Sequence, residues 1–164
     1  MELVCPAGNL PSLKAAVDNG ADSIYVGFKD DTNARHFAGL NFTERTFRKA
    51  VDYAQSRGRK IFVAINTYPQ PGRFERWQAA VDQAAEYGVN ALILADMGVM
   101  DYAAERWPDL RLHLSVQGSV TTAAGIQFFC DNFGIKRVVL PRVLSVNQVA
   151  QVIKESPVPV ETFG

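Results

Sequence analysis

Polar or ionisable side chains follow the short apolar segments of this sequence, at the points where strands would end. These residues are Cys5, Lys29, Asn66, Asp96, Gln117, Arg142 and Glu161. In a sheet of parallel strands the carboxyl ends share one edge, so these side chains would meet there. Carboxylates, amides and guanidinium groups can bind and orient a small polar molecule, and a carboxylate can also accept a proton. The pattern therefore predicts a polar pocket.

Two arginines are the candidate substrate-binding residues. Arg142 follows an apolar segment and could clamp a carboxylate or phosphate through two parallel hydrogen bonds. It could instead form an ion pair with Glu161 or Asp96. Arg35 lies in the polar loop after the second apolar segment and could contribute a second positive charge.

The candidate catalytic residues are Asn66, Asp96, Gln117, Arg142 and Glu161. Asp96 could act as a general base or a hydrogen-bond acceptor, or it could cap the helical pattern that follows it. Asn66 could orient a substrate or start a turn, and Gln117 could bind a carbonyl or hydroxyl group or join a network at the strand ends. Glu161 follows apolar residues and could point inward or into solvent.

No arrangement of residues specifies a reaction. The sequence has no Ser-His-Asp order, zinc-ligand spacing or CxxC motif. His36 lies in a polar loop, and His113 lies near the start of its segment, at the end away from the predicted pocket. Cys5 and Cys130 are expected to pack in the core, and two thiols cannot form a four-cysteine site. We therefore predict no metal site within this chain.

Short apolar segments alternate with helical patterns along the whole chain. The segments are Leu3–Cys5, Ile24–Phe28, Ile61–Ile65, Ala91–Ala95, Leu112–Val116, Val138–Leu140 and Val158–Val160. Several are continuously apolar, which is typical of strands buried on both faces of a parallel sheet. Two of the helical stripes are Phe47, Ala50, Val51, Ala54 and Trp77, Ala80, Val81, Ala84. Gly20, Gly88 and Gly134 each precede an apolar residue and then a strand, which is typical of helix ends.

The alternation predicts an α/β fold with about seven parallel strands and six helices. A doubly wound sheet suits the length, but no glycine-rich phosphate loop follows the first strand. A TIM-type (β/α)8 barrel better explains the polar residues at the strand ends, although it needs eight strands and about 250 residues. We therefore expect residues 1–164 to form a single domain, the N-terminal portion of an incomplete barrel. Its exposed sheet edges are expected to favour self-association.

Composition excludes several classes of function. Seventeen basic residues balance seventeen acidic ones, so no nucleic-acid partner is expected. The apolar segments are too short to span a membrane, and the N-terminus does not resemble a signal peptide. The expected location is the cytoplasm.

Several stretches of the sequence resemble the collagenase-like peptidase family. They are Cys5-Pro6-Ala7-Gly8-Asn9, the stretches 20–27 and 33–42, Ala64-Ile65-Asn66, Ala95-Asp96, Ser115-Val116-Gln117 and the stretch 139–145. Within this family, Lys29–His36 and Leu140–Ser145 are similar to the UbiU-like proteins. Val143 stands where family members that resemble peptidases carry a glutamate, which argues against proteolysis.

The resemblance to UbiU-like proteins implies a specific role. Such proteins pair with a UbiV-like partner, carry a [4Fe–4S] cluster and support oxygen-independent ring hydroxylation in ubiquinone biosynthesis. The implied small-molecule ligands are ubiquinone precursors and prephenate, the expected hydroxyl donor. The family's cluster cysteines are expected beyond Gly164, so this chain alone would bind no cluster and be inactive as a hydroxylase. The complete protein would then act within a hydroxylase complex.

Three other functions remain open from the sequence. The same family resemblance allows a collagenase-like peptidase or a protein that hydroxylates RNA bases. A non-catalytic scaffold that binds a partner is the third alternative.

Overall fold

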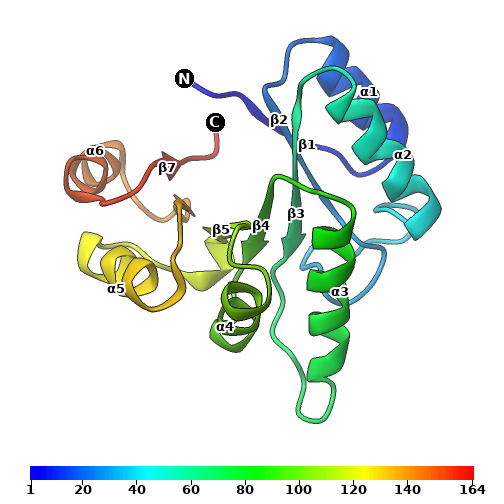
Figure 1. Cartoon of the computed structure of the whole chain (residues 1–164). Helices are drawn as coiled ribbons and strands as arrows, with labels where there is room; N and C mark the ends of the chain where they lie inside the picture. Colours follow the sequence, from blue (N-terminus) through cyan, green and yellow to red (C-terminus); the bar gives the residue numbers. More distant parts are fainter.

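The computed structural model describes residues 1–164 and contains one sheet of seven parallel strands. The strands are β1 (Val4–Pro6), β2 (Ser23–Gly27), β3 (Lys60–Ile65), β4 (Ala91–Leu94), β5 (Arg111–Leu114), β6 (Arg137–Val139) and β7 (Val160–Glu161). The six α-helices are α1 (Leu10–Asp18), α2 (Glu44–Gln55), α3 (Phe74–Glu86), α4 (Met97–Arg106), α5 (Ala123–Phe133) and α6 (Val146–Glu155), and Val116–Gly118 form a short 3₁₀ turn. Each helix connects two neighbouring strands (Figure 1).

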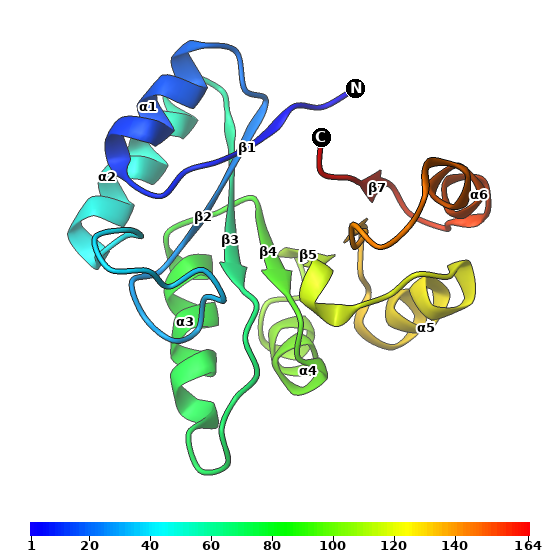
Figure 2. The same ribbon diagram turned by 180° about the vertical axis from the view of Figure 1, so that it is seen from behind.

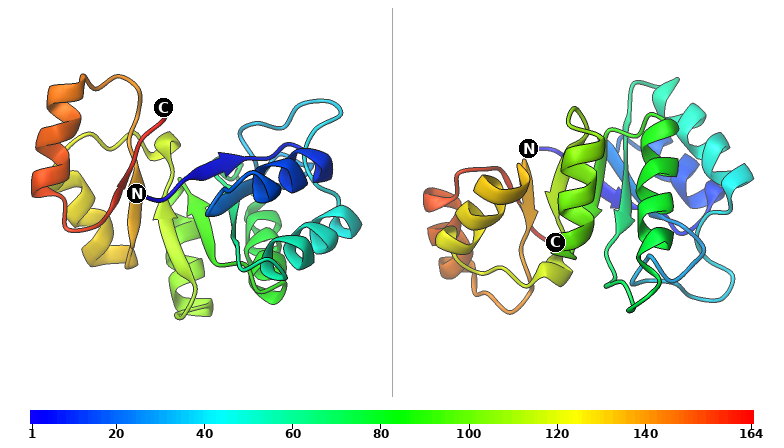
Figure 3. Two further views of the ribbon diagram at one scale, coloured as in Figure 1. Left: turned by 90° about the horizontal axis from the view of Figure 1, so that it is seen from above. Right: turned by 60° about the horizontal axis from the view of Figure 1, so that its bottom comes forward.

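The strand order distinguishes between the two predicted architectures. Neighbouring strands follow the chain from β1 to β7 without a reversal, whereas a doubly wound sheet reverses its order at one point. The sheet curls into an open arc with the helices on its outer side, and the two termini lie near each other at its opening (Figures 2 and 3). The prediction of an incomplete TIM-type barrel with seven strands and six helices is therefore confirmed.

Both faces of the sheet are packed, which explains the continuously apolar strands. A cluster of 32 buried residues lies between the outer face and the helices. A smaller cluster lies on the inner face and consists of Phe62, Ala64, Ala91 and Ile93. Alternate residues of β3 and β4 therefore serve two different cores, because successive side chains of a strand point to opposite faces.

The predicted helix stripes are confirmed, and Gly20, Gly88 and Gly134 lie at helix ends with positive φ as predicted. The buried residues of α2 and α3 are the eight named above. Asn9 and Ser145 begin α1 and α6 with reciprocal side-chain and backbone hydrogen bonds to the third helical residue. Gly134 ends α5 with φ of 65°, a left-handed conformation that glycine adopts without a steric penalty. These local signals fix where each strand enters the sheet.

The outer edges of the arc, β1 and β7, are not paired with each other. Self-association through these edges stays a prediction, which light scattering on the purified protein can test. No helix of the chain is both long enough and apolar enough to cross a bilayer.

Candidate functional site

A cavity of about 290 Å³ lies at the carboxyl ends of the strands. Its lining comes from all seven strands or the residues next to them, and from the loop of residues 28–42. Eleven of its 21 lining residues are hydrophobic, and Tyr25, Arg35, Asn66, Gln117 and Glu161 are among the polar ones. Apolar pockets with a few convergent polar groups are typical of small-molecule sites, and in barrels they lie at this face.

The structure brings four of the six predicted site residues together. Arg35, Asn66, Gln117 and Glu161 line the cavity, whereas Asp96 and Arg142 lie outside its lining. Asp96 begins α4, where its Oδ1 accepts a hydrogen bond from the backbone N–H of Val99 at 3.0 Å. This contact is the capping role that the sequence left open for Asp96.

Arg142 is exposed, and its guanidinium stacks over the ring of Phe163 at 4.2 Å from the ring centroid. Phe163 lines the cavity, so Arg142 supports the wall without facing the interior. It forms no ion pair with Glu161, whose partner is Arg137, or with Asp96, which caps α4.

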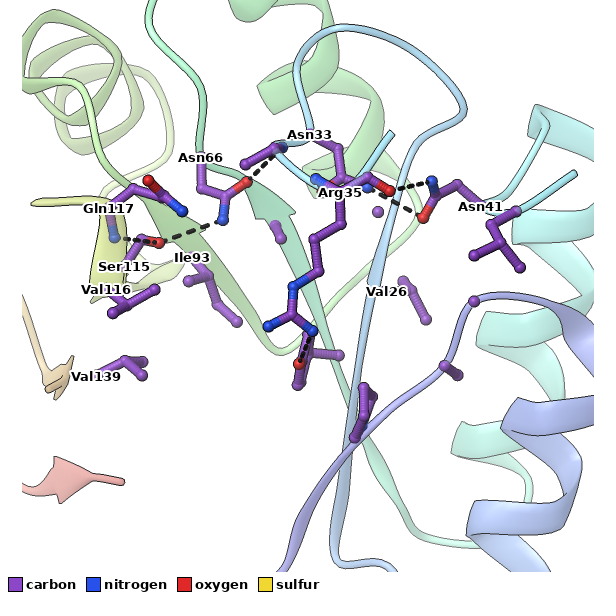
Figure 4. Close-up of a pocket in the computed structure, with 18 of the residues that line it drawn as sticks. Val26, Asn33, Arg35, Asn41, Asn66, Ile93, Ser115, Val116, Gln117 and Val139 are labelled. Atoms are coloured by element: carbon purple, nitrogen blue, oxygen red, sulfur yellow. Dashed lines mark hydrogen bonds between the residues drawn. The ribbon is translucent and has the colours of Figure 1, made fainter. Parts of the chain in front are cut away.

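The loop of residues 28–42 covers one side of the cavity, and Asn33 anchors it. Asn33 is 5% exposed, and its side chain donates to Oδ1 of Asn41 at 3.1 Å and accepts from the backbone N–H of Arg35 at 3.0 Å. Asn41 adopts a left-handed φ of 73° and donates from its own amide to the backbone carbonyl of Arg35 at 2.8 Å. Two asparagines thus hold the backbone on both sides of Arg35 (Figure 4).

Gly27 at the end of β2 makes this arrangement possible. A Cβ atom at position 27 would lie 2.0 Å from Nδ2 of Asn33, far inside van der Waals contact. The glycine therefore leaves the space that the buried asparagine occupies.

Asn66 joins the loop to the strands. Its Oδ1 accepts from the backbone N–H of Ala34 at 3.0 Å, and its Nδ2 donates to Oγ of Ser115 at 3.3 Å. Ser115 also accepts from the backbone N–H of Gln117 at 3.2 Å. Each end of the Asn66 amide is engaged by the protein, so its geometry suits holding the loop beside Arg35 (Figure 4).

Arg35 provides the positive charge of the cavity. One of its guanidinium nitrogens donates to the hydroxyl of Tyr25 at 3.2 Å, and no carboxylate lies within ion-pair distance. A guanidinium without an ionic partner can bind a carboxylate or phosphate through two parallel hydrogen bonds. The cavity therefore presents one guanidinium that has no ionic partner.

Glu161 contributes a carboxylate on another part of the cavity wall. Arg137 donates to it at 3.3 Å, and the Glu161 side chain is 17% exposed. Burial raises the pKa of Glu161, and Arg137 partly opposes this effect. Arg137 also binds Glu2, which precedes β1. Sequence reasoning missed Tyr25, Arg137 and Glu2, although a charged residue opening an apolar strand was a usable signal for Arg137.

His113 lies inside the arc but outside the cavity lining. It is 1% exposed, its ring packs edge-on against Phe62 at 4.9 Å, and neither ring nitrogen has a hydrogen-bond partner. Burial lowers the pKa of His113 to about 3, and the charge of Arg137 adds to the effect. The histidine is therefore neutral at physiological pH.

The residues of this chain do not fit an iron–sulfur cluster. Cys5 and Cys130 are both free thiols, and no three His, Cys, Asp or Glu side chains are grouped so that they could hold a metal ion. A [4Fe–4S] cluster needs four ligands. The cluster implied by the family resemblance thus stays a prediction for the complete protein.

Comparison with known proteins identifies the family. The family model of peptidase family U32 matches residues 8–164. This chain belongs to peptidase family U32. A solved U32 peptidase superposes on 99% of the chain and 68% of its own length, with a TM-score of 0.80 at 17% sequence identity, which supports the shared fold.

Among U32 relatives, tRNA hydroxylation protein P of Helicobacter pylori is 36% identical over 96% of this chain and 37% of its own length. An uncharacterized protease of Methanocaldococcus jannaschii is 35% identical over 100% of this chain and 40% of its own length. The chain thus spans well under half the length of these relatives. The resemblance to the collagenase-like peptidase family is confirmed at the level of the family.

Proposed function

We propose that this chain is the small-molecule-binding part of a U32 hydroxylation protein. The observation that carries the proposal is the cavity, where an unpaired Arg35 guanidinium and the Glu161 carboxylate share a small, mostly apolar space. Relatives named for tRNA hydroxylation support hydroxylation as the reaction class. A peptidase would need a nucleophile beside a base, and the hydroxyl of Ser115 is bonded only to amide groups.

At a finer level, we propose the role in ubiquinone biosynthesis that the UbiU-like stretches imply. Prephenate, the proposed hydroxyl donor, is a small ring with one hydroxyl and one carboxylate, and it carries a second carboxylate on its pyruvyl side chain. Arg35 would bind one carboxylate, while Tyr25 and Gln117 lie on the wall around it. The balanced charge of the chain also favours a small ligand over a nucleic acid. The [4Fe–4S] cluster and the UbiV-like partner belong to this proposal.

Hydroxylation of an RNA base is the second candidate. It is favoured by the name of the Helicobacter pylori relative, which matches 96% of this chain. Under this alternative, the cavity could still bind the small hydroxyl donor, and other surfaces would bind the RNA. The two candidates therefore share the role of Arg35 and differ in the acceptor.

One complementation experiment separates these functions. The complete protein and its partner are produced without oxygen in a host that lacks its own ring-hydroxylation and tRNA-hydroxylation proteins. Hydroxylated quinone intermediates and hydroxylated nucleosides from tRNA are then measured by mass spectrometry in the same cells. Restored quinone with unmodified tRNA supports the ubiquinone role, and the reverse result supports the RNA role. Restoration of neither, together with peptide hydrolysis, would refute hydroxylation.

Prephenate binding tests the ligand directly. Calorimetry on the complete protein should show weaker binding after Arg35→Met, because the only guanidinium in the cavity is lost. Arg142→Ala should have a smaller effect, since Arg142 contacts the wall residue Phe163 from outside. Equal loss in both variants would place the anion elsewhere.

A further inference from the structure

A row of charged side chains crosses the inside of the arc beside the cavity. Arg137 of β6 lies between the carboxylates of Glu2 and Glu161, and Lys60 of β3 contacts Glu2 at 3.2 Å. We call Glu2, Lys60, Arg137 and Glu161 the inner charge network. The side chains of Arg137, Glu2 and Glu161 are 14%, 25% and 17% exposed. The network therefore joins residues beside the first and last strands; Arg137 at its centre is largely buried, whereas the side chain of Lys60 is 55% exposed.

Only one member of the network reaches the cavity. Glu161 is part of the lining, whereas Arg137, Glu2 and Lys60 are not. The guanidinium of Arg137 uses one terminal nitrogen for each carboxylate and lies 5.6 Å from the ring centroid of Phe62. Because the planar guanidinium of Arg137 is held by a carboxylate on each side, it restricts the orientation of the Glu161 carboxylate.

We infer that Arg137 is a positioning residue, which together with Glu2 fixes the direction and the charge of the Glu161 carboxylate at the cavity wall. Glu161 then accepts a hydrogen bond from a donor group of the molecule whose acid group binds Arg35. The matching ligand class is a small hydroxy acid. The assignment of Glu161 to a ligand rests on the proposed function, but the action of Arg137 and Glu2 on Glu161 does not.

The charges around Glu161 act in opposite directions. Burial raises its pKa, the positive charge and hydrogen bond of Arg137 lower it, and the negative charge of Glu2 raises it. The other titratable or charged groups on nearby elements are Lys60 on β3, Arg111 and the neutral His113 on β5, Arg35 in the loop and Arg142 beside Phe163. The Glu2 pKa is about 2, because hydrogen bonds from Ser23, Arg137 and Lys60 outweigh the effect of burial. Glu2 is thus ionised whenever Glu161 titrates.

The inference predicts opposite effects for two substitutions. Arg137→Met removes the group that lowers the Glu161 pKa, so this pKa should rise. Glu2→Gln removes a negative charge and leaves Arg137 to Glu161 alone, so the pKa should fall. A general loss of the fold would instead remove the burial that raises the Glu161 pKa in both variants, and both pKa values would then move in the same direction.

The test is a carboxyl ¹³C NMR titration of the complete protein labelled at glutamate, with the Glu161 signal assigned by its loss in Glu161→Gln. Prephenate is the probe for binding, followed by calorimetry across the pH range in which Glu161 titrates. The acidic limb of the binding profile should move to higher pH in Arg137→Met and to lower pH in Glu2→Gln. Arg137→Lys keeps the positive charge but loses the planar guanidinium that contacts both carboxylates. It should therefore weaken prephenate binding about tenfold, while shifting the acidic limb of the binding profile less than Arg137→Met does.

The control is Arg59→Met, which breaks an exposed ion pair with Asp22 at 3.6 Å and should leave the titration unchanged. Glu161 shifts of the same sign in both network variants, or none in either, would overturn the inference. Opposite shifts without any prephenate binding would support the role of Arg137 and count against the proposed function. If Arg137→Met does not fold, Glu2→Gln with Arg137→Lys decides the question.

Discussion

Substituting Gly27 with alanine should release the loop that carries Arg35. The new Cβ atom would lie 2.0 Å from Nδ2 and 2.4 Å from Cγ of Asn33, and non-bonded carbon atoms prefer separations of about 3.5–4.0 Å. The Asn33 side chain must therefore move away from position 27 by ~1–1.5 Å. It would then lose its hydrogen bonds with Asn41 and with the backbone of Arg35.

The cost follows from the burial of Asn33. Leaving a buried polar group without its partner costs about 1–3 kcal/mol, so the two lost hydrogen bonds amount to about 2–6 kcal/mol. This destabilisation should affect mainly the loop of residues 28–42, because its backbone around Arg35 is hydrogen-bonded to the side chains of Asn33, Asn41 and Asn66. A local destabilisation of about 2 kcal/mol or more should accelerate hydrogen exchange at least about thirtyfold.

Hydrogen exchange of the backbone amides of Ala34 and Arg35 measures this release directly, since both amides donate to asparagine side chains. Gly8→Ala is a matched control on the same cavity. Its Cβ would meet Cδ2 of Leu40 at 3.3 Å, and the flexible leucine can move.

A double-mutant cycle with Asn33→Ala tests the cause. Once the Asn33 amide is absent, Gly27→Ala should cost little, because the remaining contact is a Cβ at 3.1 Å. Exchange at Ala34 and Arg35 in Gly27→Ala within twofold of that in the unsubstituted protein would refute the reasoning. An effect of Gly27→Ala on exchange that is the same with and without the Asn33 side chain would refute it too.

Three further predictions concern single side chains. Arg35→Met should weaken binding of a small carboxylate about 10–100-fold, by calorimetry, with unchanged thermal stability, because Arg35 has no ionic partner to lose. Asp96→Ala should lower the free energy of unfolding by about 1 kcal/mol, in urea denaturation, without changing carboxylate binding, because it removes the cap of α4. The pKa of His113 is lowered to about 3, because the folded state favours the neutral ring. The folded protein therefore has its full stability above the ordinary pKa of 6.5 and loses stability as the pH falls towards 3. Denaturation at about pH 7 and pH 5 should show a loss of about 2 kcal/mol that His113→Phe abolishes, and an equal loss in both proteins would contradict this.

The elements of the fold were predictable because each is specified locally. The stripe of Trp77, Ala80, Val81 and Ala84 has helical spacing, and all four residues are buried in α3. The caps at Asn9 and Ser145 depend on residues three positions away. Of the seven polar residues predicted at the strand ends, Asn66, Gln117 and Glu161 line the cavity, because parallel strands bring their carboxyl ends to one edge, whereas the other four do not. The sequence pattern did not distinguish the role of Asp96, which caps α4, from that of Asn66, which hydrogen-bonds the backbone of the Arg35 loop.

The contacts inside the arc depend on register, which no local pattern contains. Gly27, Ala64, Ile93, His113 and Arg137 are successive partners across β2 to β6 and form one row on the inner face. A strand buried on both faces does not reveal which of its residues join such a row. Side-chain size increases along the row, and its first three members, Gly27, Ala64 and Ile93, line the cavity, whereas His113 and Arg137 do not. The size gradient therefore explains why the cavity lies beside the Arg35 loop, while the other end of the row is filled by His113 and by Arg137, which holds Glu161.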